Sequence, residues 1–146
     1  MPSLKETLGS GANRKSLLAA AETVLDEEVT DKSGLSGIAI KGAFKLIKGI
    51  KPGFIREVID HLMDDFLDGV DPIYQDAADK DERLEQYLPA SSARMADALL
   101  SITDARAERA ARAVIKKTYK KLRPTAKKHV EASAPRLGKM LDTLLA

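Results

Sequence analysis

The segment FIREVIDHLMDDFLDGV, residues 54 to 70, decides the fold class because its residues divide into two opposite sides at a helical period. At 100° per residue, one side collects the apolar residues Ile55, Val58, Ile59, Leu62, Met63, Phe66, Leu67 and Val70. The other side carries His61 and five carboxylates, named here the acidic face: Glu57, Asp60, Asp64, Asp65 and Asp68. This pattern predicts an amphipathic helix whose apolar side packs against other helices.

The preceding segment GLSGIAIKGAFKLIKGIKPGF, residues 34 to 54, predicts a second amphipathic helix. Its lysines fall on one arc and form a secondary basic face: Lys41, Lys45, Lys48 and Lys51. Opposite them lie Ala39, Ala43, Leu46, Ile47 and Ile50, with Ile40 and Phe44 at the flanks, and only Ile38 breaks the pattern. We expect the helix to end at Lys51-Pro52-Gly53, because a residue that precedes proline disfavours the helical conformation.

Two glycines of this helix, Gly42 and Gly49, share the boundary between its two sides. A glycine inside a helix costs about 1 kcal/mol relative to alanine. We therefore expect the backbone of a neighbouring element to pass close along this boundary. A phosphate-binding loop does not fit, because Lys41 precedes Gly42, Ala43 stands where a hydroxyl is needed, and no strand is expected upstream.

The rest of the chain also has helical periods and helix-ending residues, and nothing alternates with a period of two. Ser3 and Glu6 form a capping-box pattern before a short helix that Gly9 ends, and GSGAN at 9–13 is typical of a hinge. Asp71-Pro72 is typical of the start of a new helix, and Arg123-Pro124 of a helix end. Further helices are expected over 14–29, 82–88, 92–122 and 126–132 and from Pro135 onward.

These elements predict an all-α fold: a single compact bundle of six to eight helices with a long central helix over about 92–122. We expect one domain over residues 1–146, with residues 1–13 as a candidate for a flexible N-terminal arm. Cysteine is absent, so no disulfide or thiolate chemistry is expected. The sequence contains neither a signal-peptide pattern nor a membrane-spanning apolar run, and we expect a cytoplasmic protein.

Charge is segregated along the chain although the net charge is only +2. Between Glu57 and Asp104 there are thirteen acidic residues and three basic ones. Between Ala105 and Lys128 there are ten basic residues and one acidic residue, Glu108. We name those ten cations the basic stretch and treat them as the main candidate interaction face: Arg106, Arg109, Arg112, Lys116, Lys117, Lys120, Lys121, Arg123, Lys127 and Lys128.

The sequence offers no pattern of catalytic residues, metal ligands or cofactor-binding residues. The two histidines, His61 and His129, lie in different regions, and no serine sits in a Gly-x-Ser-x-Gly elbow. The segment around Gly69 lacks the carboxylate that a calcium loop needs at its twelfth position. Carboxylates of the acidic face could converge with His61 on a metal, but they oppose the apolar side and are expected to face water. We therefore expect a protein that is not an enzyme and needs no cofactor.

Two kinds of binding fit the charge pattern, and the sequence favours the first. The first is protein–protein interaction or self-association, in which the acidic face of one molecule meets the basic stretch of another. The second is binding of nucleic acid, or of an anionic surface such as a membrane, through the basic stretch. Pairing of the two faces within one folded chain would remove much of the case for either. No small-molecule substrate is expected.

Four segments of the chain carry a resemblance to a known family: MPSLKETL at 1–8, DKSGLSGIAIKGAFKLIKGIKPGF at 31–54, MADALLSITDARAERA at 95–110 and YKKLRPTAKKHVEASAPRLG at 119–138. In these segments the chain resembles a family of small uncharacterised bacterial proteins, mainly actinobacterial, that is known only as a domain of unknown function. The resemblance covers nearly the whole chain. It implies a self-standing helical domain and supplies no activity, cofactor or catalytic residue.

Overall fold

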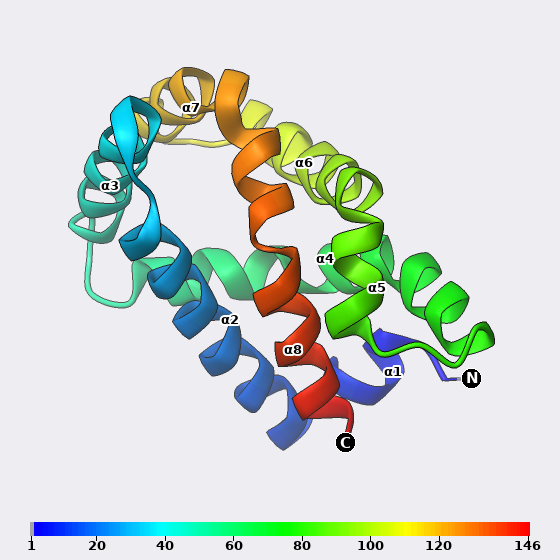
Figure 1. The fold of residues 1–146 in the computed structure, drawn as a ribbon. Coiled ribbons are helices and arrows are strands. Elements are labelled where there is room, and N and C mark those ends of the chain that lie inside the picture. Colours follow the sequence, from blue (N-terminus) through cyan, green and yellow to red (C-terminus); the bar gives the residue numbers. More distant parts are fainter. Residues whose placement is uncertain (1) are drawn as a thin grey trace.

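Eight α-helices and no strand make up residues 2–146, the part of the chain that the computed structural model describes. The helices are α1 (Leu4–Leu8), α2 (Gly11–Asp31), α3 (Gly34–Lys48), α4 (Phe54–Asp79), α5 (Leu84–Ala90), α6 (Ser92–Glu108), α7 (Ala113–Ala132) and α8 (Ala134–Leu145). In Figure 1, α2 and α8 run side by side in front of α4, while α3 and α7 lie together at one end. The predicted all-α bundle is confirmed.

Helix α4, and not the helix expected over 92–122, is the centre of the core, and its apolar side is buried as its sequence pattern predicts. The side chains of Ile59, Met63, Leu67, Val70 and Ile73 are buried along one side of it. Together with residues from α1, α2, α5, α6 and α8, they form one hydrophobic cluster. The helix begins after Gly53, whose φ of +74° is a left-handed conformation that glycine adopts without strain.

The expected helix start at Asp71-Pro72 is wrong, because α4 continues through Pro72 to Asp79. The apolar side also continues, with Ile73 and Ala77 each 1% exposed, and this packing offsets the hydrogen bond that proline cannot donate. Asp71 has a different role: its carboxylate accepts a 2.8 Å hydrogen bond from the backbone N–H of Leu4.

Helix α1 packs against α4 and does not extend into solvent. Leu4 and Leu8 are 0% and 1% exposed, so both ends of the helix are held in the core. The predicted N-cap at Ser3 is confirmed, because its hydroxyl accepts a 3.0 Å hydrogen bond from the N–H of Glu6. The Glu6 carboxylate accepts from the Ser3 hydroxyl at 3.3 Å and not from the Ser3 backbone N–H, so the reciprocal half of a capping box is not formed. The segment proposed as a flexible arm, residues 1–13, is therefore anchored through residues 4–8, and Met1 lies outside the described residues.

The single long helix expected over 92–122 is wrong. The chain turns between Glu108 and Ala113, and α7 folds back against α6. Residues 108–113 contain only alanine, arginine and glutamate, so no large apolar side chain holds a straight helix in the core there, although these residues favour helix locally. Folding back instead brings Tyr119 and Arg123 of α7 onto Asp104 of α6.

The expected helix end at Arg123-Pro124 is also wrong, because α7 runs through Pro124 to Ala132. Proline inside a helix leaves the carbonyl four residues earlier, here that of Lys120, without its N–H donor. Both Pro124 and Lys120 are exposed, so water can satisfy that carbonyl.

The expected close backbone approach along Gly42 and Gly49 is wrong as well. A β-carbon at Gly42 would meet nothing within 4 Å, and Gly49 ends α3. The close approach is instead at Gly138 of α8, where a β-carbon would lie 2.6 Å from the carbonyl carbon of Leu84 in α5. Next to it, the Asp142 carboxylate accepts hydrogen bonds from the first two N–H groups of α5, Leu84 at 3.0 Å and Glu85 at 2.9 Å. The backbones of α5 and α8 are therefore in direct contact at Gly138, and the Asp142 side chain caps the start of α5.

Candidate functional site

The acidic face of α4 is neutralised by cations of the same chain. Arg14 of α2 joins two of its carboxylates, with Nη1 2.7 Å from Asp64 and Nη2 2.8 Å from Asp60. These hydrogen bonds raise the pKa of Arg14. The remaining members are paired as Lys51–Glu57 at 2.9 Å, Arg106–Asp65 at 3.5 Å and Lys5–Asp68 at 3.5 Å. The hydrogen bond from Lys51 lowers the pKa of Glu57, which therefore stays ionised.

The basic stretch is divided between paired and unpaired cations. Arg106 meets Asp65, Arg123 lies 2.8 Å from Asp104, and Lys127 lies 3.0 Å from Asp97. Within residues 2–146, no carboxylate lies within ion-pair distance of the other seven: Arg109, Arg112, Lys116, Lys117, Lys120, Lys121 and Lys128. Six of these seven lie before α7 or in its first half, and only Lys128 lies in its second half.

Helix α3 adds further unpaired cations next to α7. Lys41, Lys45 and Lys48 also lack a carboxylate partner in the described part of the chain, and Lys48 lies over the Phe44 ring at 5.6 Å. Lys51, the fourth lysine of the secondary basic face, is paired with Glu57 instead. Because α3 packs against α7, the unpaired cations of both helices gather at one end of the molecule (Figure 1).

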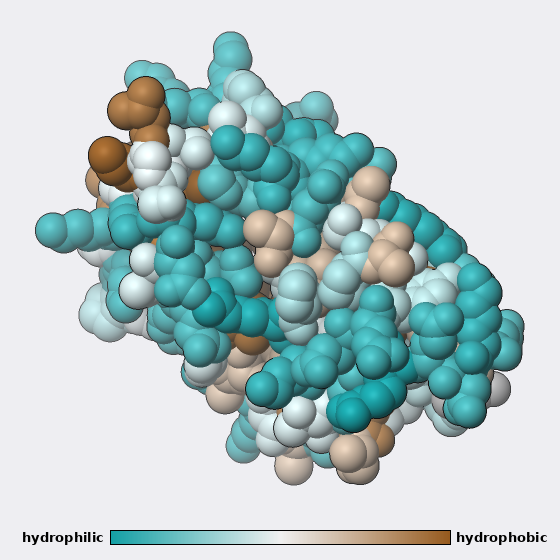
Figure 2. Space-filling view, viewed as in Figure 1, coloured by the Kyte–Doolittle hydropathy of each residue, from teal (hydrophilic) through white to brown (hydrophobic). Residues whose placement is uncertain are grey.

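Exposed aliphatic side chains lie beside the lysines of α3. We name them the aliphatic stripe, because they follow one line along the helix: Leu35 (88% exposed), Ile38 (68%) and Leu46 (52%). Figure 2 shows brown, apolar atoms at the edge of the molecule where Figure 1 places α3. The expected burial of Leu46 is wrong, because α3 turns Ile40, Ala43, Phe44 and Ile47 toward the bundle and leaves Leu46 outside. Helix α3 contains no acidic residue, so its outward surface is both cationic and apolar.

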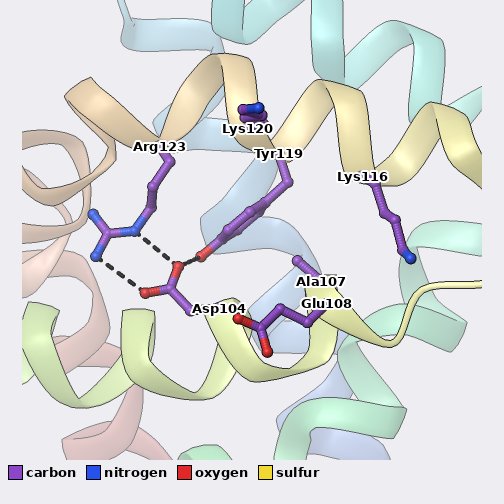
Figure 3. Close-up of a pocket in the computed structure, with 7 residues that line it drawn as sticks. All are labelled: Asp104, Ala107, Glu108, Lys116, Tyr119, Lys120 and Arg123. Carbon is purple, nitrogen blue, oxygen red and sulfur yellow. Dashed lines mark hydrogen bonds and ion pairs between the residues drawn. The ribbon is translucent and has the colours of Figure 1, made fainter.

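A polar cleft of about 670 Å³ lies between α6 and α7. Figure 3 shows Tyr119 and Arg123 reaching from α7 to the carboxylate of Asp104 on α6. The Tyr119 hydroxyl and Arg123 Nε donate to the same oxygen of Asp104, at 2.5 Å and 2.8 Å. Burial raises the pKa of Tyr119, and the hydrogen bonds from Arg123 and Tyr119 lower the pKa of Asp104. The network therefore joins the two helices through an ion pair and a tyrosine hydroxyl.

Replacing Asp104 with asparagine is expected to destabilise the protein in a pH-dependent way. The folded-state pKa of Asp104 lies below its ordinary value of 3.8, so its ionised form stabilises the fold above that value and this contribution falls as the pH drops through the folded-state pKa. The Asp104→Asn variant should therefore unfold at lower urea concentration than the wild type at pH 7. At pH 2.5 the two midpoints should approach each other. An equal difference at both pH values would contradict this role for Asp104.

The histidines do not form an acid–base or metal site with other residues. His129 Nε2 lies 3.2 Å from Ser36 Oγ, but within residues 2–146 no carboxylate hydrogen-bonds to this imidazole to orient it as a base. Burial, with nearby Lys32 and Lys128, lowers the pKa of His129. His61 is exposed on the acidic face. Among the described residues, no three histidine or carboxylate side chains converge in a way that could hold a metal ion.

An apolar cavity of about 360 Å³, partly open to solvent, lies between the helices of the bundle, and the sequence does not predict it. All eight helices contribute to its walls, which are formed mostly by aliphatic residues and methionines. Its polar members are Glu28, Lys32, Thr103, His129 and Ser133. The lining residues are spread over every helix, with the largest numbers from α2 and α4, and they follow the same apolar period as a fully packed core. No sequence pattern therefore distinguishes the wall of a cavity from a fully packed core.

One of three comparisons with known proteins gives a match. The model of a family of unknown function, DUF6918, matches residues 4–145. The comparisons with curated proteins and with solved structures each found no match. Between residues 2 and 146, no helix has the combination of length and apolar character that crossing a bilayer requires. The expected resemblance to a domain of unknown function is confirmed, and the chain belongs to the family of unknown function DUF6918.

Proposed function

We propose that the protein is a non-catalytic, cytoplasmic interaction module that binds anionic lipid surfaces. The docking surface consists of the aliphatic stripe, Lys41, Lys45 and Lys48 of α3, and the unpaired cations before and within the first half of α7. The observation that carries the proposal is the exposure of Leu35 and Ile38, at 88% and 68%, on a helix that has several lysines and no acidic residue. Surface helices with this composition lie in the boundary between lipid headgroups and acyl chains.

Self-association through opposite charges has less support from this geometry. Every carboxylate of the acidic face lies within 3.5 Å of a cation of its own chain. A second molecule would have to displace Arg14 or Lys51 before its basic stretch could pair there. The unpaired cations have no equivalent internal competitor, so they favour an external anionic partner.

A bilayer fits the docking surface better than nucleic acid does. Phosphates could pair with the lysines, but a nucleic-acid backbone offers no apolar environment to Leu35, Ile38 and Leu46. Stacking on bases has little support, because Tyr119 is the only Phe, Tyr or Trp between residues 105 and 128, and its hydroxyl is bound to Asp104 between α6 and α7. The cytoplasmic leaflet supplies both an anionic surface and an apolar layer, and each lysine near such a surface contributes about 1 kcal/mol.

Vesicle co-sedimentation tests the proposal. Wild-type protein is expected to sediment with vesicles that contain 30% phosphatidylglycerol and to remain in solution with pure phosphatidylcholine. The Lys117→Glu/Lys121→Glu variant should bind the anionic vesicles about 30-fold more weakly, because at least two contributions of about 1 kcal/mol are lost. Lys15→Glu/Lys139→Glu is the matched control, because it changes the net charge equally at exposed positions outside the docking surface.

The control variant is expected to bind the anionic vesicles about as well as the wild type. Equal loss in both double variants would show that only the net charge matters and would contradict a defined docking surface. A gel shift with random duplex DNA completes the test. Retention of DNA without retention of vesicles would identify nucleic acid as the partner and overturn the lipid proposal.

A further inference from the structure

We infer that the apolar cavity is a binding site for a single unbranched acyl chain that carries a carboxylate, with the carboxylate at Lys32. The inference rests on the interior of the bundle and not on the docking surface, so it can hold or fail independently of the proposed function.

The size of the cavity exceeds that of an ordinary packing defect. Protein cores pack as densely as organic crystals, and their voids seldom exceed the volume of a water molecule. An engineered apolar cavity of about 150 Å³ already binds benzene. At about 360 Å³, this cavity falls near the lower end of the range of about 300–1,000 Å³ for small-molecule sites. A slender ligand with one chain fits this volume better than a lipid with two chains.

The lining favours an aliphatic ligand over an aromatic one. Phe66 and the His129 imidazole are the only rings among the lining residues, so a planar ligand would find few stacking partners. Met63, Met95 and Met140 add flexible side chains that adapt to a chain of variable shape. The inner wall is fully packed from behind, since Leu4, Leu88 and Met95 are each 0% exposed.

One end of the cavity is polar, and this gives the ligand an orientation. Lys32 Nζ lies 3.0 Å from Glu28 Oε2 and 3.5 Å from the backbone oxygen of His129. The Lys32 and Glu28 side chains are only 12% and 13% exposed. A cation at the end of an apolar cavity fits an anionic end group, because a partly buried charge needs a hydrogen-bonded partner.

Glu28 can release Lys32 because it has a second cation. Arg136 Nη1 lies 3.2 Å from Glu28 Oε1, and the same guanidinium also binds Asp31. When a ligand carboxylate takes the place of Glu28 beside Lys32, Glu28 therefore remains paired with Arg136. The two carboxylates at this end, Glu28 and Asp31, are both paired with Arg136. The other neighbouring groups, Ser36, His129 and Ser133, carry no negative charge.

Dodecanoate and dodecan-1-ol, without vesicles and at micromolar concentration, test the inference with the full-length protein. Titration calorimetry and native mass spectrometry are expected to show one dodecanoate bound per chain. The Ala21→Phe variant, which places a ring on the α2 wall of the cavity, should bind dodecanoate at least tenfold more weakly. Ala19→Phe is the matched control, because Ala19 is exposed on the same helix and does not line the cavity; it should bind normally.

The Lys32→Gln variant tests the orientation and does not depend on whether Ala21→Phe folds. It should lose about tenfold in dodecanoate affinity and keep the wild-type affinity for dodecan-1-ol. No binding of dodecanoate to the wild type, or equal binding by folded Ala21→Phe, would overturn the site. Equal loss of both ligands in Lys32→Gln would overturn the assignment of the carboxylate to Lys32.

Discussion

The Gly138→Ala variant is expected to lose about 3 kcal/mol or more of its free energy of unfolding. The added methyl group would lie 2.6 Å from the carbonyl carbon of Leu84 and 2.8 Å from the Cα of Glu85, and it would overlap the Leu84 carbonyl oxygen. These are backbone atoms, so no side-chain rotation relieves the overlap, and α5 and α8 must move apart. That movement would also strain the two hydrogen bonds from α5 to Asp142. Urea unfolding followed by circular dichroism measures the loss.

Gly42→Ala is the matched control for this prediction. Gly42 also lies inside a helix, but a β-carbon there would meet nothing within 4 Å. Because alanine favours helix over glycine, this variant should gain up to about 1 kcal/mol. Opposite signs for the two substitutions would establish that backbone contact at Gly138, and not helix propensity, sets the effect. Equal stability of Gly138→Ala and wild type would contradict the α5–α8 packing.

The parts of the fold that depend on local sequence could be predicted. The apolar residues of 54–70 recur at the helical period, and they form the buried side of α4. The cap predicted at Ser3 lies at the start of α1. The errors lie where contacts between helices override local preference. Pro72 and Pro124 are typical helix breakers that lie inside helices here, and the chain turns near Ala110, where every residue favours helix.

In the candidate site, too, the sequence predicts the residues but not the contacts between helices. The charged residues of both faces could be named from the sequence, but their partners could not, because Arg14 meets Asp60 across 46 residues of chain. The helical period predicts Leu46 on the buried side of its helix, because the sequence does not reveal the angle at which α3 meets the bundle. The cavity has no local signal, since it depends on how eight helices fail to fill one volume.

The aliphatic stripe should dominate membrane affinity. Burial of a leucine or isoleucine side chain contributes about 1.5–3 kcal/mol, so replacing Leu35, Ile38 and Leu46 with serine should weaken binding to anionic vesicles by more than about 100-fold. These side chains are 88%, 68% and 52% exposed, so their replacement should leave the free energy of unfolding nearly unchanged. A large loss of stability would instead indicate that the stripe packs within the protein.

A polarity-sensitive fluorophore on a single cysteine measures the insertion of α3 most directly, and the absence of native cysteine makes this labelling specific. Gly42→Cys places the label on the outward side of α3 among Leu35, Ile38 and Leu46, and Ala12→Cys places a matched label at an exposed position near the start of α2. With anionic vesicles, we expect a strong blue shift from the label at position 42 and none from the label at position 12. An unchanged spectrum at position 42, or equal shifts at both positions, would contradict the proposed docking surface.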